Sequence, residues 1–268
     1  KIDEIKNPVA RECLKYFKID YPIEITTFAD IPANTGLGSS SAFAVGLVNA
    51  LFALEGKLAS KYEIASIAAK IEIDILGRKI GKQDHFACCY GNINNLVFKK
   101  NETVVINPIV ASSRSIKTLE ASMIMFYTNQ KRNSETVLKN QYRIKKKQFE
   151  NLKKLKDLVG ISKDIILNKN FRAKEFGILL NRNWELKKKI NRLSSNKLVD
   201  KYYNQALNLG AYGGKLLGAG NGGFLLFIAS KSSQKKIANK LNKLKKMYIK
   251  FDYSGTRITY FDKSGEAN

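Results

Sequence analysis

The chain has 268 residues, a length that suggests about two lobes and can bury a full core without disulfides or metals. Hydrophobic residues make up 44% of it, which excludes a disordered polymer, and no apolar run approaches the roughly 18 residues that cross a membrane. Three cysteines, Cys13, Cys88 and Cys89, have no metal-ligand spacing, so we expect reduced thiols and a cytoplasmic protein. The chain starts without a signal peptide or an initiating Met, as a processed or incomplete chain would.

The net charge is +24, and residues 131–200 alone carry 20 basic against 7 acidic groups. Such a charge favours anionic partners: phosphorylated metabolites, nucleotides, nucleic acid or a membrane surface. We favour the simpler interpretation, a solvated basic face. No RNA-binding motif is present and aromatic residues do not alternate with the basic runs, so nucleic acid is an alternative partner that we do not expect.

Hydrophobic periodicity and turn residues predict the following elements in the first part of the chain. They are a helix over 8–18, a strand over 21–28, a Pro- and Gly-containing loop over 30–38, a buried helix over 39–54, a helix over about 60–76 ending at Gly77, a loop from Gly81 into a third helix that ends at Gly91, and paired strands over 93–98 and 103–109.

The second part begins with a predicted strand over 122–127, after a polar stretch at 111–120 where we place the lobe boundary. From 131 to 210 the pattern is helical and basic, with a core-facing stripe of Phe149, Leu152, Leu155 and Val159. A glycine-rich loop then leads to a strand over 224–229, a helix near 233–246 with Ile237, Leu241 and Leu244 inward, and strands over 247–253 and 256–261.

The first chemical motif is a glycine–serine segment placed just before the buried helix. Glycines let the backbone approach a ligand closely, and the free N–H groups of a helix start favour anions. The segment is not a Walker A loop, because no Lys follows the glycines. A phosphate cradle and a serine-capped helix after a turn both fit. The candidate residues are Pro32, Gly36, Leu37, Gly38, Ser39, Ser40 and Ser41.

Two carboxylates, Glu72 and Asp84, form the second motif. Glu72 interrupts an otherwise apolar helix, and Asp84 lies near the start of the next one. Beside a phosphate cradle they could hold Mg²⁺, or one could accept a proton from an attacking hydroxyl; the alternative is an exposed Glu and a helix-start Asp. His85 is the single histidine of the chain, which excludes multi-histidine metal sites, and we expect it to be a local hydrogen-bond partner.

The third motif is the run of seven glycines over 210–223. Gly218, Gly220 and Gly223 satisfy G-x-G-x-x-G, but we reject a dinucleotide-binding fold, because a helix precedes the run and a strand follows it. Such a loop can still lie against phosphates or a sugar, whereas a plain tight turn would not need this many glycines.

The order of these motifs resembles that of the GHMP kinases, which include galactokinase, homoserine kinase and mevalonate kinase. Four segments look like the heptose kinase branch of that family: PANTGLGSSS at 32–41, GKQDH at 81–85, FGILLNRNWELK at 176–187 and KLLGAGNGGFLLF at 215–227. The resemblance extends from about residue 8 to 262.

The resemblance implies a two-lobed α+β fold, with a ribosomal-protein-type N-terminal lobe over 1–115 and a ferredoxin-like C-terminal lobe over 116–268. It implies an enzyme that uses ATP and Mg²⁺ to phosphorylate the anomeric hydroxyl of D-glycero-D-manno-heptose 7-phosphate. Ser40 and Glu72 would coordinate the metal, and Asp84 would be the catalytic carboxylate. Residues 36–41 would wrap the ATP phosphates, and the loop carrying Gly218, Gly220 and Gly222 would close over the reaction centre.

One departure from the family pattern matters. The first quarter of these kinases, with its sugar-binding stretch, has no counterpart in residues 1–30, so we expect the N-terminal lobe to be incomplete at its start. The alternatives are therefore another sugar kinase, of the fucose or galactose type, or a truncated and inactive relative that only binds ATP.

Overall fold

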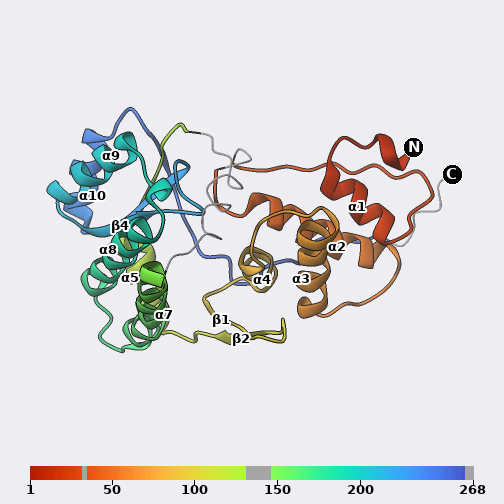
Figure 1. The fold of residues 1–268 in the computed structure, drawn as a ribbon, viewed down its shortest axis with the longest axis horizontal. Helices are drawn as coiled ribbons and strands as arrows, with labels where there is room; N and C mark the ends of the chain where they lie inside the picture. The colour runs from red at the N-terminus through yellow and green to blue at the C-terminus, as the bar shows by residue number, and fades with distance from the viewer. Residues whose placement is uncertain (32–34, 131–145, 263–268) are drawn as a thin grey trace. The chain divides into compact units, whose positions relative to one another are not determined.

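The computed structural model describes residues 1–31, 35–130 and 146–262 (Figure 1). It divides into two compact units: the first comprises Lys1–Asp30, Gly38–Leu96 and Asp252–Asn268, and the second Ile31–Leu37 and Val97–Phe251. Within the described residues, no helix is both long and apolar enough to cross a membrane.

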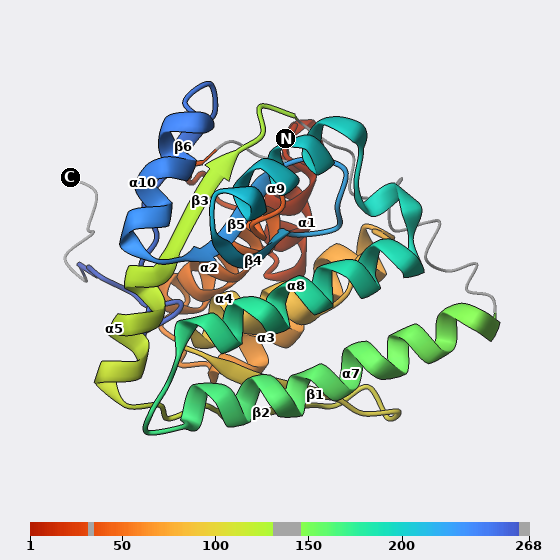
Figure 2. The same ribbon diagram turned by 90° about the vertical axis from the view of Figure 1, so that its left-hand side faces the viewer.

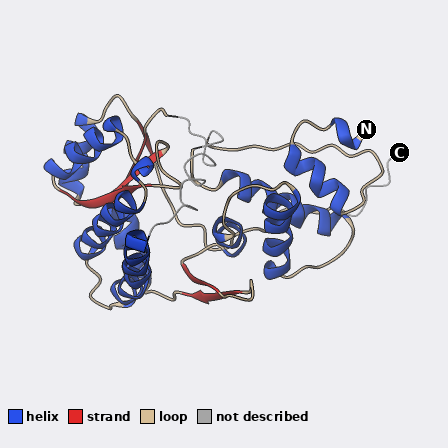
Figure 3. Cartoon of the chain, viewed as in Figure 1, coloured by secondary structure: helices blue, strands red, loops and turns tan. Residues whose placement is uncertain are grey.

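The first unit is mainly helical (Figure 3). After a short 3-10 turn, η1 (Ile2–Glu4), it contains α1 (Pro8–Tyr16), α2 (Ser39–Leu54), α3 (Lys61–Lys70), the π-helical turn η2 (Ile71–Ile75), α4 (Gln83–Tyr90) and the start of β1 (Asn94–Phe98). Helix α2 packs against α1, α3 and α4, which explains why its sequence is apolar on nearly every side. The helices predicted in this part of the chain are confirmed.

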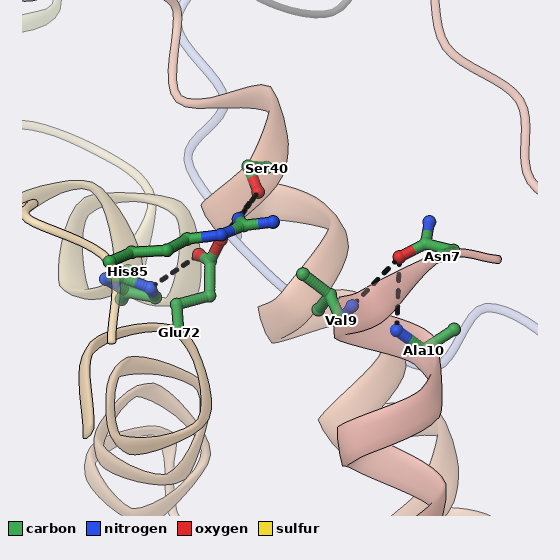
Figure 4. A network of polar contacts seen from close by, with 7 residues as sticks. Asn7, Val9, Ala10, Ser40, Glu72 and His85 are labelled. Atoms are coloured by element: carbon green, nitrogen blue, oxygen red, sulfur yellow. Dashed lines mark hydrogen bonds and ion pairs between the residues drawn. The ribbon is translucent and has the colours of Figure 1, made fainter. Parts of the chain in front are cut away.

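The helices of the first unit start in two different ways. Asn7 caps α1, since its Oδ1 accepts hydrogen bonds from the N–H groups of Val9 at 3.0 Å and Ala10 at 3.2 Å (Figure 4), and Ser60 caps α3 through the N–H of Glu63. Helix α2 instead follows Gly38, which has a left-handed φ of 69° and offers no side-chain cap. The start of α2 therefore has no side-chain cap, and it is the start that carries the three serines.

The second unit is built on a four-stranded antiparallel sheet in the order β4-β5-β3-β6. Strands β1 and β2 form a separate two-stranded sheet. In chain order the elements are β2 (Val104–Pro108), α5 (Ser113–Ser122), β3 (Met123–Tyr127), α7 (Lys146–Leu167), α8 (Ala173–Ile190), η4 (Arg192–Ser194), α9 (Lys197–Asn208), β4 (Ala211–Leu216), β5 (Phe224–Ala229), α10 (Lys231–Lys240) and β6 (Lys245–Met247).

Helices cover both faces of the four-stranded sheet. Helices α9 and α10 lie on one face, and α8 lies on the other with α5 and α7 (Figure 1); α7 and α8 run side by side (Figure 2). An aromatic cluster joins α8, α9 and the sheet: Tyr203 of α9 packs against Trp184 of α8 and Phe227 of β5 at ring-centroid distances of 6.1 and 5.6 Å. Trp184 is fully buried in this cluster, and the antiparallel sheet backed by helices agrees with the α+β prediction.

Helix α8 approaches strand β4 so closely that only glycine fits at the crossing. A Cβ on Gly213 would overlap the carbonyl oxygen of Gly177, and a Cβ on Gly177 would lie 2.6 Å from the Cβ of Tyr212. Gly213 belongs to β4, a strand that the sequence analysis treated as part of a loop. The glycine-rich loop is thus preceded by a strand, not directly by a helix, and the absence of a helix after it still excludes a dinucleotide-binding fold.

Three other predictions are wrong. No strand forms over 21–28, where Phe28 is 94% exposed: the residues alternate, but no described strand pairs with them. The strands predicted at 247–253 and 256–261 reduce to β6. The stripe predicted on α7 is wrong at both ends, since Phe149 and Val159 are 67% and 46% exposed and Leu158 is buried instead; its middle members, Leu152 and Leu155, are half-buried.

The predicted connection at 111–120 lies largely within α5. The two compact units divide the chain at other points, because segments distant in sequence join each unit. The lobe ranges 1–115 and 116–268 stay a prediction.

The Gly177–Gly213 crossing makes a stability prediction. Gly213→Ala should lower the free energy of unfolding by about 1–3 kcal/mol, the usual cost of overpacking a tight interior, as measured by the midpoint of urea unfolding. Gly160→Ala is the matched control: it lies on α7 with nothing within 4 Å of the added Cβ, and should raise stability by up to about 1 kcal/mol. Equal effects of the two substitutions would contradict this packing.

Candidate active site

The centre of the candidate site is a direct contact between Ser40 and Glu72. Ser40 lies at the uncapped start of α2, and its Oγ donates to Glu72 Oε1 at 2.5 Å (Figure 4). Glu72 lies in the π-helical turn η2 and its side chain is fully buried. The π-turn widens the helix at this point, a feature common at functional sites. Two residues predicted to share a ligand are therefore adjacent, although 32 positions separate them in sequence.

Two side chains contact the two oxygens of the buried carboxylate. His85 lies 2.8 Å from Glu72 Oε2 through its Nε2, and Arg78 contacts Glu72 Oε1 and donates to Ser40 Oγ at 2.7 Å. Because an ionised carboxylate can only accept, Nε2 of His85 is the donor; Nδ1 has no partner among the described residues. His85 is a local hydrogen-bond partner, as predicted, but its partner is Glu72. The sequence analysis missed Arg78.

These contacts keep Glu72 charged. Burial by itself raises the pKa of a carboxyl group, but the hydrogen bonds from His85 and Ser40 and the charge of Arg78 outweigh it, so the pKa of Glu72 lies below its usual range. Glu72 is not the exposed glutamate that the alternative interpretation assumed. It is a buried anion that is hydrogen-bonded to Ser40 in the first turn of α2.

Asp84 lies beside the glycine–serine loop. It is exposed, it occupies the first turn of α4, and its carboxyl group is 3.3 Å from the position that a Cβ on Gly38 would take. The first unit thus brings Gly38, Ser40, Glu72 and Asp84 into one neighbourhood. An exposed carboxylate next to a buried one offers separate places for a proton acceptor and a metal ligand.

The remaining loop residues give partial information. Gly36 and Gly38 both have positive φ, Leu37 and Ser39 are half-buried and Ser41 is buried. Pro32 lies outside the described residues. The assignment of residues 36–41 to phosphates stays a prediction.

The late glycine loop is the connection between β4 and β5 in the second unit. Gly223 is hydrogen-bonded to the hydroxyl of Thr128 through both its N–H and its carbonyl oxygen. A Cβ on Gly223 would overlap the carbonyl oxygen of Thr35, the residue just before the first glycine of the glycine–serine segment. Gly218, Gly220 and Gly222 all have positive φ. Within this unit the two glycine-rich segments therefore touch, but the role of the late loop toward a substrate stays a prediction.

Ser40 and Glu72 suit a small, hard cation. Their two oxygens are 2.5 Å apart, and Mg²⁺ prefers oxygen ligands and completes its shell with water and substrate phosphates, so one or two protein ligands are enough. Among the described residues no group of three His, Cys, Asp or Glu side chains could hold a metal ion, and the magnesium site stays a prediction.

Comparisons with known proteins define the class. Residues 5–92 match the GHMP kinases N terminal domain and residues 166–246 match the GHMP kinases C terminal domain. The chain is 32% identical, over 96% of its length and 75% of the relative's, to a D-glycero-alpha-D-manno-heptose 7-phosphate kinase of Campylobacter jejuni. It is 27% identical to a galactokinase of Pyrococcus furiosus, over 84% of this chain and 68% of the relative.

Solved structures agree. A crystal structure of a D-glycero-D-manno-heptose 1-phosphate kinase from Bacteroides thetaiotaomicron superposes with a TM-score of 0.74 and 27% identity, covering 94% of this chain and 74% of that one. A mevalonate kinase at 23% identity, with a TM-score of 0.68 over 92% of this chain and 76% of that one, shares the fold. The chain therefore belongs to the GHMP kinase family, and it is an ATP-dependent small-molecule kinase of the two-lobed α+β fold.

The buried carboxylate of Glu72 leads to a second stability prediction. In chelator-treated protein, Glu72→Gln should lower the free energy of unfolding by about 1–3 kcal/mol, because the amide leaves Arg78 and His85 without their charged acceptor. Glu63→Gln removes an exposed carboxylate of α3 and should change stability by no more than about 0.5 kcal/mol. Urea unfolding measures both; if Glu72→Gln behaves like Glu63→Gln, Glu72 is not held as described.

Proposed function

We propose that the chain is a sugar kinase that transfers the terminal phosphoryl group of ATP to the anomeric hydroxyl of D-glycero-D-manno-heptose 7-phosphate, in the formation of nucleotide-activated heptose. The observation that carries the kinase chemistry is the Ser40–Glu72 contact with Asp84 close by in the same unit. The observation that carries the substrate is the 32% identity to a heptose 7-phosphate kinase over nearly the whole chain.

The residues have distinct parts in this proposal. Residues 36–41 bind the phosphates with backbone N–H groups at the uncapped start of α2. Ser40 and Glu72 hold Mg²⁺, which neutralises charge on the phosphates when bound. Asp84 orients the sugar hydroxyl and accepts its proton, a role for which an exposed carboxylate can reach the substrate. Gly218, Gly220 and Gly222 let the backbone of the β4–β5 loop lie close to phosphates or a sugar.

Phosphoryl transfer asks little covalent chemistry of a protein. It needs positioning and neutralisation of charge. In this proposal Glu72 with its metal and the start of α2 would neutralise charge, and Asp84 would position the acceptor hydroxyl. The basic surface, with its net charge of +24, attracts anionic metabolites such as ATP and a sugar phosphate. We do not expect nucleic acid to be a partner, and we place the enzyme in the cytoplasm.

A second sugar is a specific alternative, because the chain is also 27% identical to a galactokinase. The two heptose relatives moreover carry names that place a phosphate at different positions, one at carbon 7 and one at carbon 1. The test is phosphorus NMR of the purified chain with ATP, Mg²⁺ and a panel of heptose 7-phosphate, galactose and fucose. A new anomeric phosphate signal on the heptose alone supports the proposal, and one on galactose or fucose overturns the substrate.

The catalytic carboxylate has its own test. Asp84→Asn should lower the turnover number about 10²–10⁴-fold, because an amide cannot accept the hydroxyl proton. Asp74→Asn is the control: Asp74 is exposed in the same π-helical turn as Glu72 and should keep the activity of the unchanged protein. Wild-type turnover in Asp84→Asn contradicts the role of Asp84, and unchanged ATP with every sugar favours an inactive relative.

A further inference from the structure

One nitrogen of Arg78 touches both oxygens that the proposed function gives to the metal. Its Nη1 donates to Ser40 Oγ at 2.7 Å and also contacts Glu72 Oε1, and the serine hydroxyl donates its single proton to that same carboxylate oxygen. The three atoms form a closed triangle. The cation in this triangle is the guanidinium of the protein itself.

The hydrogen-bonding capacity of Ser40 shows what this means for a metal. A hydroxyl group has one proton and two lone pairs. The proton points to Glu72, and a lone pair accepts from Arg78. A metal bound here would lie about 2.1 Å from Ser40 Oγ and from Glu72 Oε1, and would use a lone pair of each oxygen. Nη1 of Arg78 already contacts both of these atoms.

The backbone holds Arg78 in this place. Its N–H donates to the carbonyl oxygen of Glu72 at 3.1 Å, just after Gly77, whose φ is 64°. The chain therefore turns back on η2, and the side chain of Arg78 returns to the carboxylate six residues earlier. The Arg78 side chain is 26% exposed, whereas Glu72 and His85 are 0% exposed. Of these partners of the carboxylate, Arg78 is the one that has room to leave.

We propose that Arg78 is a built-in substitute cation: it occupies the Ser40–Glu72 oxygens in the metal-free protein, and the divalent ion must displace its guanidinium in order to bind. The inference rests on the proposed metal site. It assigns to Arg78 a positioning role, since the residue keeps the two ligand oxygens together and charge-balanced until the metal arrives, and it makes metal affinity a competition within the chain.

The competition can be measured without any turnover. Mn²⁺ binding to the chelator-treated protein, followed by electron paramagnetic resonance, should be about tenfold tighter in Arg78→Met. Apparent affinity is reduced by the fraction of molecules whose site is open, and a contact that is made about nine-tenths of the time leaves that fraction near one tenth. Metal-free Arg78→Met should also melt at a lower temperature and gain more from added Mn²⁺ than the unchanged protein does.

Two variants separate displacement from simple charge removal. Lys79→Met deletes a positive charge one position away, at an exposed side chain, and should change Mn²⁺ affinity by less than about threefold. Arg78→Lys keeps the charge, but its ammonium is more strongly hydrated and sits on a differently shaped side chain, so its affinity should fall between those of Arg78→Met and the unchanged protein. If Arg78→Met does not fold, Arg78→Gln is titrated in its place with the same expectation.

The outcomes distinguish the inference from the function beneath it. If Glu72→Gln abolishes Mn²⁺ binding but Arg78→Met binds Mn²⁺ no more tightly than the unchanged protein, the substitute-cation role of Arg78 is wrong and the metal site stands. If Lys79→Met tightens binding as much as Arg78→Met, the effect is general electrostatics and the role is again wrong. If the unchanged protein binds no Mn²⁺, or Glu72→Gln binds it normally, the proposed metal site fails together with the inference.

Discussion

The first unit depends on the burial of one negative charge. A carboxylate that is fully removed from water must be paired and hydrogen-bonded, and Glu72 meets this requirement with partners from three places: Ser40 at the start of α2, Arg78 in the turn after η2, and His85 in α4. The same contacts therefore fix the relative positions of α2, η2 and α4. Asp84 is adjacent to His85 in sequence, so the helix that hydrogen-bonds one carboxylate also carries the other, and the proposed chemistry follows from the way the charge is buried.

The second unit depends on a different constraint, the close approach of backbones. Helix α8 lies on β4 because Gly177 and Gly213 have no Cβ, and the β4–β5 loop lies against Thr35 because Gly223 has none. The glycine run consequently has two functions that its sequence does not separate. Gly213 is needed for packing within the unit, whereas Gly218, Gly220 and Gly222 lie in the loop that the proposed function places near phosphates. A run of glycines is thus an imperfect indicator of a binding loop, since some of them have a purely structural reason.

The sequence predicted the local features well. Helix α2 and strand β5 begin and end where the apolar pattern said they would, because each is buried on almost all sides and its pattern is unambiguous. Predictions that needed a distant partner were less successful. Residues 21–28 have the alternation of a strand, but a strand exists only where another one pairs with it, and a sequence pattern does not reveal the partner. Strand β4 was missed for the opposite reason, since its glycines have low strand propensity and its partner β5 supplies the pairing.

The site shows the same division at the level of side chains. Ser40 and Glu72 stand out in the sequence, one as a hydroxyl after a glycine turn and the other as a carboxylate in an apolar helix, whereas their roles and that of Asp84 come from the family resemblance and stay a prediction. Arg78 does not stand out, because an Arg is common in a chain with 47 basic residues, and its importance arises only from the fold of the turn that returns it to Glu72. Resemblance to a family suggests roles for residues that match its motifs. The contacts of Arg78 with Ser40 and Glu72 belong to this chain's own geometry, and they are the basis for the competition between one guanidinium and one divalent ion that we propose.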